Sequence, residues 1–452
     1  DEKKASKAIH EEFDFEINAD KIDEPQFDNE LSIISVVGEN MKKTRGISGK
    51  FFSALGKNGI NIIAIAQGSS ELNISAVIER NELSKALNVV HDSLLLSQVK
   101  TFNVMFAGTG NIGKELFRQL EREQRNLEEN HQIKINVVGI TNSREMKIFD
   151  NPESDFDLNN NFNTNLQKSD LKEFINSISS KNLPNLVFVD NTSSEDVVAE
   201  YSLLFNNNIS IVTCNKKGNS SSYEQYSKFK RLAKKNNVSF LYETNVGAGL
   251  PIIKTLNDLW ISGDEILKIE AILSGTISYI FNNYVGDNTF AEVVRTAQEL
   301  GYTEPDPRDD LNGMDFSRKM LILGREIGLP LEMSNVNIKD FLPEACLKAE
   351  SIPAFYEELE KHEPYFSSFK NEAENSGRKL RLIGVLEDGK INIEVQIVDA
   401  NHPFFGLSGS DNIISFTTSR YKNTPLVVKG PGAGAEVTAA GVFADLVRVT
   451  AQ

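Results

Sequence analysis

The stretch "VMFAGTGNIGKELFRQL", residues 104–120, decides the fold of the larger part of this chain. A short apolar run leads into a cluster of glycines, and a segment with helical periodicity follows. Gly108, Gly110 and Gly113 form the pattern GxGxxG, in which the first glycine permits a tight turn and the third lets a helix pack on a strand. The second lets the backbone approach a pyrophosphate at the start of the helix, beside Asn111 and Ile112. The pattern predicts a dinucleotide site, with a plain strand-to-helix turn as the alternative.

More strands are predicted downstream of this turn. Apolar segments at 134–142, 185–194, 209–217 and 238–247 alternate, for the most part, with helical stretches. This order is typical of a Rossmann-type, doubly wound parallel sheet, so the fold class here is α/β. Residues 150–165 are polar and rich in asparagine, and we expect them to form a loop.

The end of the second strand bears on which dinucleotide is bound. It ends in "GITNSRE" and lacks the acidic residue that would hold a ribose 2′-hydroxyl, whereas Arg144 is near enough to meet a 2′-phosphate. The sequence therefore leans towards NADP and leaves NAD open. A solvated surface charge is the other interpretation of Arg144.

A smaller unit is predicted ahead of this domain. Strands at 31–38, 60–66 and 71–79 and two amphipathic helices occur in the order βαββα, which is typical of a ferredoxin-like domain. The opening helix, "SKAIHEEF", has no partner within this unit, and the chain does not begin with Met. We therefore expect a fragment of a longer protein.

From residue 265 the pattern changes to that of an α+β domain. A helix at 290–300 and the proline-rich loop "GYTEPDPRDD" precede a long helix, "NGMDFSRKMLILGREIG". Antiparallel strands follow, with a hairpin turn predicted at "EDGK". The chain ends in a second glycine-rich start of a helix, "GPGAGAEVTAAGVFADLVRV".

Composition excludes several classes of partner. The formal net charge of −16 and the lack of a basic stripe argue against nucleic acid. No apolar run approaches the roughly 20 residues of a membrane span, so no membrane partner is expected. Cys214 and Cys346 are the two cysteines and form neither a disulfide framework nor a zinc spacing. We expect a reducing, cytoplasmic compartment and small-molecule ligands, and we assign no role to the five histidines.

A second group of polar residues has the chemistry of an acid or base. Asp315 and Lys319 are four residues apart on the long predicted helix and so share a face, and Glu304 lies on the preceding loop. A lysine beside a carboxylate suits the interconversion of a carbonyl and an alcohol, provided that burial lowers its pKa. Spacing alone favours the alternative, an ordinary surface ion pair.

Several motifs together resemble a known family. The segments "LGYTEPDPRDDLNGMDFSRKMLILGRE", "DNTSS", "TCNKK", "ETNVGAGLPII" and "LSGTISYIFN" are similar to homoserine dehydrogenase and follow that family's order over residues 100–452. Residues 31–98 resemble the second ACT domain of aspartokinase. The pair resembles the C-terminal portion of the bifunctional aspartokinase/homoserine dehydrogenases.

The resemblance implies a division into domains. It gives an ACT regulatory domain at 1–98, whose first part is a remnant of a preceding ACT domain. A dinucleotide-binding domain at 99–250 would be completed by the C-terminal helix at 430–452, and a substrate-binding and dimerisation domain would span 251–429. A homodimer or homotetramer is the implied assembly.

The same resemblance implies a reaction and its residues. The reaction is the reversible, NAD(P)H-dependent reduction of L-aspartate 4-semialdehyde to L-homoserine, in threonine and methionine biosynthesis. Lys319 would be the general acid/base, while Asp315 and Glu304 would bind the amine and hydroxyl of homoserine. Lys216 and Thr192 would line the cofactor and substrate cleft at the carboxyl ends of two strands.

A cation site is also implied. Glu243, with the carbonyls of Val246, Ala248 and Leu250, matches the family's site for a monovalent cation, here sodium. From the residues alone, "VGAGLP" is a tight start of a helix with Pro251 in the first turn, and both interpretations can hold together.

Two further positions are left with two interpretations each. Gly432 in "KGPGAGAEV" would bring the last helix under the cofactor, or would serve a packing turn. Gln67, where a strand meets a loop, would sense threonine at an interface of ACT domains, or would be a solvent-exposed turn residue.

Two other functions compete with the enzyme. One is a catalytically inactive, amino-acid-responsive dimer built on ACT pairing, and the other is a different dehydrogenase on the same scaffold. Lys216, Glu304, Asp315 and Lys319 are all present, whereas an inactive relic is expected to lose at least one of them. The length and order of the matched motifs argue against a different dehydrogenase.

Overall fold

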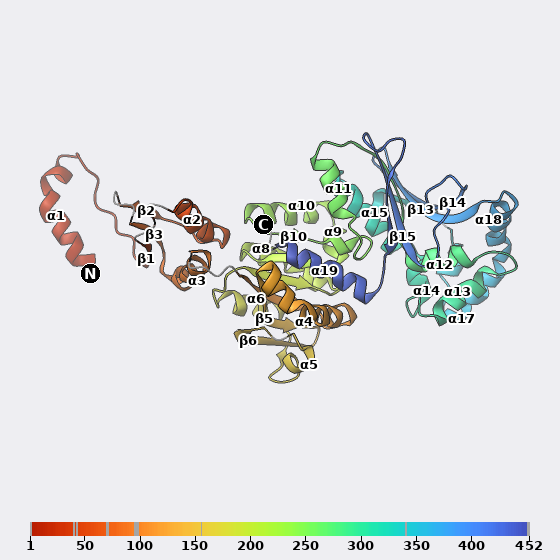
Figure 1. Ribbon diagram of the computed structural model, residues 1–452, viewed down its shortest axis with the longest axis horizontal. Helices are drawn as coiled ribbons and strands as arrows, with labels where there is room; N and C mark the ends of the chain where they lie inside the picture. The colour runs from red at the N-terminus through yellow and green to blue at the C-terminus, as the bar shows by residue number, and fades with distance from the viewer. Residues whose placement is uncertain are drawn as a thin grey trace. The chain divides into compact units, whose positions relative to one another are not determined.

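The computed structural model describes residues 2–38, 41, 44–68, 72–94, 99–154, 156–339 and 341–449 (Figure 1). The chain forms two compact units, a smaller one of residues 1–98 with 182–184 and a larger one of 99–181 with 185–452. The predicted start of a strand at 71 and the last residues of the chain, 450–452, lie outside the described residues.

The smaller unit has the predicted βαββα order. Its sheet is antiparallel in the order β1-β3-β2, with strands β1 (Leu31–Val37), β2 (Ala64–Gln67) and β3 (Asn73–Glu79). Alternate residues of β3 are buried in one core with residues of two helices, α2 (Ile47–Lys57) and α3 (Leu83–Leu94). β2 begins at Ala64, later than predicted. The remaining elements are α1 (Glu2–Asn18) and the short helix η2 (Arg80–Glu82).

The larger unit begins with a seven-stranded sheet in the order β10-β9-β8-β4-β5-β6-β7. Five of its strands are parallel, as predicted: β4 (Lys100–Ala107), β5 (Ile133–Thr141), β8 (Leu186–Asp190), β9 (Ser210–Thr213) and β10 (Phe240–Leu241). The other two extend one edge as antiparallel strands: β6 (Glu145–Glu153) and β7 (Gln167–Lys168).

The expectation of a loop at 150–165 was therefore wrong in part. β6 runs on to Glu153, and a short helix, α5, spans Leu158–Asn161. The last four residues of β6 are exposed, so this edge strand does not need the apolar alternation by which a buried strand is recognised.

Helices cover both faces of this sheet. α4 (Asn111–His131) and the last helix, α19 (Ala435–Val449), lie side by side and share one core with Val187 and Val189 of β8 (Figure 1). Because strand residues alternate, Phe188 faces the opposite side. The other helices of this region are α6 (Leu171–Ser179), α7 (Glu195–Ala199), α8 (Tyr201–Asn206), α9 (Lys216–Asn219), α10 (Tyr223–Lys235), η3 (Glu243–Asn245) and α11 (Ile253–Ile261).

The rest of the unit is built on a six-stranded sheet in the order β12-β14-β13-β11-β15-β16. Its strands are β11 (Ile266–Ile272), β12 (Val336–Ile338), β13 (Lys379–Glu387), β14 (Lys390–Val398), β15 (Asp411–Thr418) and β16 (Leu426–Pro431). β12 pairs in parallel with β14, and all other pairs are antiparallel. The predicted hairpin is confirmed: Asp388 and Gly389, at φ 50° and 73°, join β13 to β14.

Helices pack on this second sheet. α12 (Gly275–Asn283), α15 (Met314–Glu326) and α18 (Glu363–Asn375) contact β13. The others are α13 (Phe290–Glu299), α14 (Pro307–Leu311), η4 (Met333–Asn335), α16 (Glu344–Leu347) and α17 (Ile352–Lys361). Among the described residues, no helix is both long enough and apolar enough to cross a membrane.

Candidate active site

The glycine turn between β4 and α4 has the geometry that its pattern predicts. Gly108 has φ 96°, and a Cβ there would lie 3.0 Å from the main chain of Asn191. A Cβ on Gly113 would lie 2.1 Å from the carbonyl oxygen of Gly108. Gly110 differs, because a Cβ there would meet nothing within 4 Å. Packing therefore requires the first and third glycines, and the space at the second is open to a ligand.

A buried amide beside this turn lacks a partner. Both polar atoms of the Asn191 side chain are buried without a hydrogen bond to the described residues. An unsatisfied buried polar group costs about 1–3 kcal/mol, so this amide fits a site that receives a polar ligand. The neighbouring Thr192 packs on the same turn, since its Cγ2 would lie 3.0 Å from a Cβ on Gly108. Asn191 was not predicted, although it stands in the motif "DNTSS".

The turn after β5 lies against the glycine turn. The Asn142 side-chain oxygen accepts from the main-chain N–H of Arg144 at 2.8 Å, and its amide donates to Thr109 Oγ1 at 3.3 Å. The side chain of Arg144 is exposed. This position, beyond the carboxyl end of the second parallel strand, is where the sequence placed a group for the ribose.

A buried carboxylate joins the ends of β8 and β9. Asp190 accepts from the main-chain N–H of Thr192 at 2.8 Å, from Tyr201 Oη at 2.7 Å and from Asn215 Nδ2 at 3.1 Å. Burial raises the pKa of Asp190, although these hydrogen bonds oppose the shift. Asp190 therefore joins Thr192 and Asn215, the residue before Lys216, in one hydrogen-bond network.

In the second predicted group Lys319 is buried, whereas the side chain of Asp315 beside it is 49% exposed. Asp315 lies in the first turn of α15, and Lys319 follows one turn later. Lys319 Nζ lies 2.8 Å from Asp315 Oδ2 and donates to the carbonyl of Leu273 at 2.6 Å. Lys319 is only 7% exposed, which rules out the solvated pair that spacing alone favoured.

A second lysine reaches the same carboxylate from the other sheet. Lys216 begins α9, separated by two residues from the end of β9, and its Nζ lies 3.2 Å from Asp315 Oδ1. We define the lysine cluster as Lys216, Asp315 and Lys319. The structure therefore brings together three of the four predicted catalytic residues.

Burial and charge act in opposite directions within the lysine cluster. Burial lowers the pKa of Lys319, the charge of Lys216 lowers it further, and Asp315 opposes both. Burial would raise the pKa of Asp315, but the ammonium groups of Lys319 and Lys216 hold it well below its usual range. A lysine whose pKa is lowered in this way gives up its proton more readily than one in water.

The fourth predicted residue, Glu304, contacts Asp310, whose charge acts on Lys319 of the cluster. The Glu304 side chain is exposed, and its main-chain N–H donates to Asp310 Oδ2 at 2.7 Å. Asp310 Oδ1 accepts from Thr276 Oγ1 at 3.1 Å, and the negative charge of Asp310 opposes the lowering of the Lys319 pKa. Sequence reasoning missed Asp310 and Thr276, although both stand in the quoted motifs.

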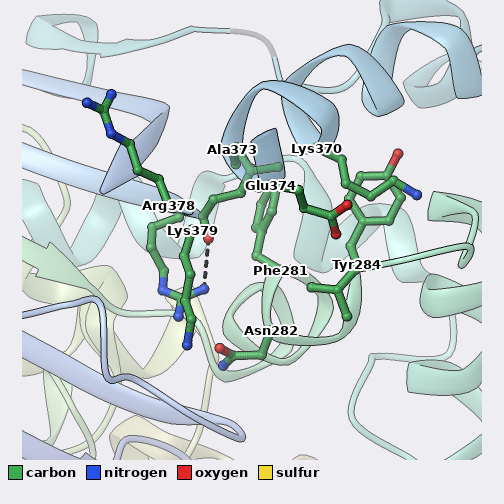
Figure 2. Close-up of a pocket in the computed structure, with 11 residues that line it drawn as sticks. Phe281, Asn282, Tyr284, Lys370, Ala373, Glu374, Arg378 and Lys379 are labelled. Atoms are coloured by element: carbon green, nitrogen blue, oxygen red, sulfur yellow. Dashed lines mark hydrogen bonds between the residues drawn. The ribbon is translucent and has the colours of Figure 1, made fainter. Parts of the chain in front are cut away.

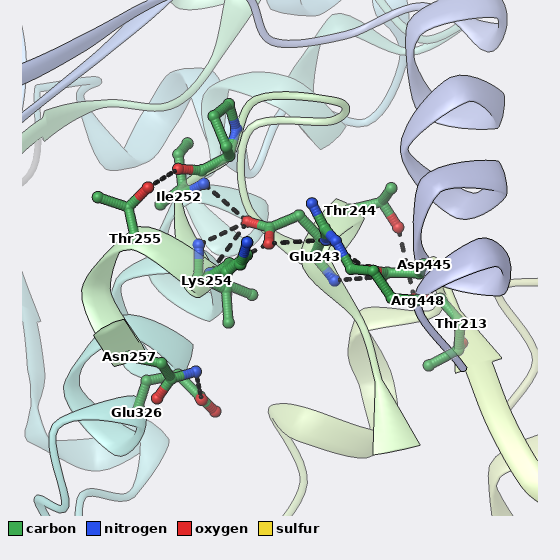
Figure 3. A network of polar contacts seen from close by, with 12 residues as sticks. Thr213, Glu243, Thr244, Ile252, Lys254, Thr255, Asn257, Glu326, Asp445 and Arg448 are labelled. Atoms are coloured by element: carbon green, nitrogen blue, oxygen red, sulfur yellow. Dashed lines mark hydrogen bonds and ion pairs between the residues drawn. The ribbon is translucent and has the colours of Figure 1, made fainter. Parts of the chain in front are cut away.

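The Glu243 carboxylate binds main-chain N–H groups at the start of α11 (Figure 3). Its Oε1 accepts from the main-chain N–H groups of Ile252 and Ile253 at 2.7 and 2.6 Å, and its Oε2 accepts from Lys254 N at 3.0 Å. Arg448 of α19 lies 3.3 Å away. These contacts favour the interpretation as a tight start of a helix. Because these contacts engage the Glu243 carboxylate, the ligands that remain for the predicted cation site are main-chain carbonyls.

The part of the chain that the structure describes holds no group of three or more His, Cys, Asp or Glu side chains that could bind a metal. Gly247 and Ala248 have left-handed backbone, at φ 74° and 52°, so the carbonyls of the predicted set, Val246, Ala248 and Leu250, lie on a sharp turn.

Two other predicted positions have structural surroundings of their own. A Cβ on Gly432 would lie 1.9 Å from Asn412, which supports a packing turn. Gln67 ends the edge strand β2 of the smaller unit, pairs with Ile74 and is exposed. A pocket at the C-terminal end of α12, lined by residues such as Phe281, Lys370 and Arg381, includes none of the predicted site residues (Figure 2).

The doubly wound sheet contains a strand–glycine turn–helix, and the buried Lys319 of α15 is linked through Asp315 to Lys216 beyond the carboxyl end of β9. This combination is typical of a dinucleotide-dependent dehydrogenase. Family models agree in detail. The homoserine dehydrogenase model matches residues 251–447, its NAD-binding domain matches 108–243, and an ACT domain matches 34–94.

Curated relatives identify the family. Homoserine dehydrogenase of Schizosaccharomyces pombe is 40% identical, over 77% of this chain and 96% of its own length. The chain belongs to the homoserine dehydrogenase family, which consists of oxidoreductases with an NAD(P)-binding domain. Bifunctional aspartokinase/homoserine dehydrogenases of Zea mays and Haemophilus influenzae are 41% and 38% identical over 98% of this chain. The chain spans only 49% and 54% of these two relatives, about half their length.

Solved structures share the fold of the larger unit. A protein of unknown function from Candida auris is 35% identical, with a TM-score of 0.73 over 78% of this chain and 99% of its own. A hyperthermophilic archaeal homoserine dehydrogenase in complex with NADPH is 22% identical, with a TM-score of 0.60 over 78% and 98%.

Proposed function

We propose that this chain reduces L-aspartate 4-semialdehyde to L-homoserine with NADPH, reversibly, and that Lys319 is the proton donor. The observation that carries the proposal is the buried Lys319, whose Nζ lies 2.8 Å from Asp315, while Lys216 Nζ lies 3.2 Å from the same carboxylate. The family membership supports the reaction. No observation favours the inactive regulatory dimer, because all the charged groups of the cluster are present and in contact.

The dinucleotide would be held by the glycine turn. The main chain of Gly108, Gly110 and the first helical residues Asn111 and Ile112, with the Asn191 amide, form a cradle of suitable chemistry. When bound, the cofactor supplies a hydride. Thr192, which packs on the glycine turn, and Lys216, which follows β9, would line the cofactor site, and we propose Gly432 only as a packing residue against Asn412.

The proton would come from Lys319. Reduction places a hydride on the aldehyde carbon, and the charge that develops on the oxygen is neutralised by a proton from Lys319 Nζ. Asp315 and the Leu273 carbonyl orient this ammonium group. The lowered pKa of Lys319 brings the group closer to the proton affinity that transfer requires.

The substrate ammonium would meet the acidic side of the site. Glu304 is exposed and Asp310 is linked to it, whereas Asp315 is already flanked by two lysines. We therefore assign the ammonium to Glu304 with Asp310 and assign to Asp315 chiefly the orientation of the lysines. Fixing a small, flexible substrate in this way lowers the entropic part of the barrier.

Several finer features remain part of the proposal. Arg144 would bind the 2′-phosphate of NADP, and the archaeal relative's complex with NADPH supports this preference. Sodium would bind the carbonyls of Val246, Ala248 and Leu250 at the turn before α11. We further propose that the protein forms a homodimer or homotetramer and that threonine binds as an effector at the ACT domain near Gln67. The chain would belong to a bifunctional protein with an aspartokinase part, and that protein would lie in a reducing compartment such as the cytoplasm.

The experiment that tests the proposal is NADPH oxidation with aspartate semialdehyde, followed by absorbance, with NADH run in parallel. Turnover by the parent chain and its loss in Lys319→Met would support it. An inactive parent chain that nevertheless binds NADPH would contradict it and would favour the regulatory alternative.

A further inference from the structure

Two charged residues at the far end of α15 are buried and have no role in the proposed chemistry. The side chain of Arg325 is 0% exposed and that of Glu326 is 2% exposed. Glu326 follows Lys319 by about two helical turns, so both side chains lie on one face of α15. Buried charges are costly unless they are paired, so their partners indicate what they hold in place.

Arg325 ties α15 to the helix that carries Lys216. Its Nη1 donates to the main-chain carbonyl of Asn219, the last residue of α9, at 2.8 Å. Its Nε and Nη2 donate to the carbonyl of Leu331 at 3.0 and 2.8 Å. α9 therefore contacts α15 at both ends, through Lys216 with Asp315 and through Asn219 with Arg325.

Glu326 ties the same end of α15 to three other segments. It accepts from Tyr226 Oη of α10 at 3.1 Å, from Asn257 Nδ2 of α11 at 3.0 Å and from the hydroxyl of Tyr242, which follows β10. Lys230 of α10 lies 3.4 Å away. Figure 3 shows Asn257 meeting Glu326 beside α11. These contacts join α15 to the dinucleotide-binding part.

The position of Lys216 depends on such contacts because α9 is short. A helix of four residues cannot hold its own shape, since a single turn is unfavourable to nucleate. Asn215 caps its start by accepting from Lys217 N at 3.1 Å. At the other end of α9, the Arg325 guanidinium reaches the last carbonyl of the helix from α15.

We propose that Arg325 is a positioning residue, supported by Glu326, that holds α9 against α15 so that Lys216 meets Asp315 beside Lys319. The inference rests on the proposed function of the lysine cluster. A displacement of about 1 Å in such a site lowers turnover by up to about 10²-fold, so a contact on the far end of α15 is expected to act on the rate.

The test is a double-mutant cycle between Arg325→Lys and Lys216→Met, read as kcat and as KM for NADPH. Lysine keeps the charge but lacks the planar fork that reaches two carbonyls. We expect Arg325→Lys to lower kcat by about 10-fold or more with KM for NADPH changed less than about 2-fold, because Arg325 does not contact the glycine turn. In the Lys216→Met background the same substitution is expected to have little further effect.

Arg381→Lys is the matched control. Arg381 is also buried, and it also donates to main-chain carbonyls, those of Leu380, Phe404, Phe405 and Leu407. None of these residues belongs to α9 or α15. Any fold-loss of kcat from Arg381→Lys is therefore expected to be the same in the Lys216→Met background as in the parent chain.

Glu326→Gln is run in the same cycle as a second variant, because it preserves the size of the side chain if Arg325→Lys impairs folding. Two results for whichever of Arg325→Lys and Glu326→Gln folds would overturn the proposal. One is an unchanged kcat, and the other is a fold-loss of kcat that is as large in the Lys216→Met background as in the parent chain. An unchanged kcat in Lys216→Met itself would also overturn the proposal, because the position of Lys216 would then not matter to the rate. The proposed function fails separately, if the parent chain binds NADPH but does not reduce aspartate semialdehyde.

Discussion

The glycine turn and the lysine cluster lie in the same unit and are built in opposite ways. The turn is one contiguous stretch, and its shape follows from backbone sterics at Gly108 and Gly113. The cluster joins Lys216, from the end of β9, to Asp315 and Lys319 on α15. The difference teaches that a local pattern specifies the glycine turn, whereas the proposed acid/base group depends on how two sheets are assembled. Substitutions should therefore impair one region without the other.

The largest effect is expected from Lys319→Met. Loss of the proton donor should lower kcat by about 10²–10⁴-fold, and NADPH binding, measured by fluorescence titration, should stay the same because the glycine turn is untouched. Lys217→Met is the control, since Lys217 follows Lys216 but pairs with the exposed Glu195 at 3.1 Å. Comparable losses in both variants would contradict a special role for Lys319.

Gly113→Ala and Gly110→Ala should separate packing from binding within the turn. A methyl at Gly113 would strike the carbonyl oxygen of Gly108, so we expect a loss of about 1–3 kcal/mol in the free energy of unfolding, measured with urea. A methyl at Gly110 meets nothing and should leave stability far less changed while weakening NADPH binding. Equal destabilisation by the two substitutions would show that the open space at Gly110 has been misinterpreted.

Arg144→Ala should change the choice of cofactor and little else. A charge-assisted contact to a phosphate contributes about 1.5–3 kcal/mol, so we expect kcat/KM for NADPH to fall by about 10-fold or more and that for NADH to hold. The ratio of the two values is the measurement. Arg122→Ala, which removes an exposed arginine paired with Glu123 on α4, is the matched control and should leave the ratio unchanged.

The smallest effects concern the position of the pH profile. Reduction needs protonated Lys319, so its rate should fall as the pH rises through the pKa of Lys319. Three charged groups act on Lys319: Lys216 lowers its pKa, and Asp315 and Asp310 raise it. Lys216→Met should move the alkaline limb of kcat to higher pH, and Asp315→Asn should move it to lower pH. Shifts of the same sign would break the assignment of that limb to Lys319.

Sequence patterns predicted the glycine turn, the parallel strands and the shared face of Asp315 and Lys319. The patterns did not predict the polar end of the edge strand β6, which extends to Glu153. Its last residues are exposed, and an exposed strand needs no alternation of apolar residues. The candidate site was predicted in part, because Asn191 and Asp310 stand in motifs that were recognised for other residues. Their burial and contacts, which single them out, are not visible in the motif.

What the sequence by itself determined is local. The order of strands and helices and the tight turn at Gly108 follow from periodicity and backbone sterics, which act over a few residues. Only the tertiary structure decided that Lys319 is buried, that Lys216 faces Asp315 and that the Glu243 carboxylate caps α11. Desolvation and Coulomb interactions depend on distance in space and not on separation along the chain, so these properties appear only once the sheets are packed.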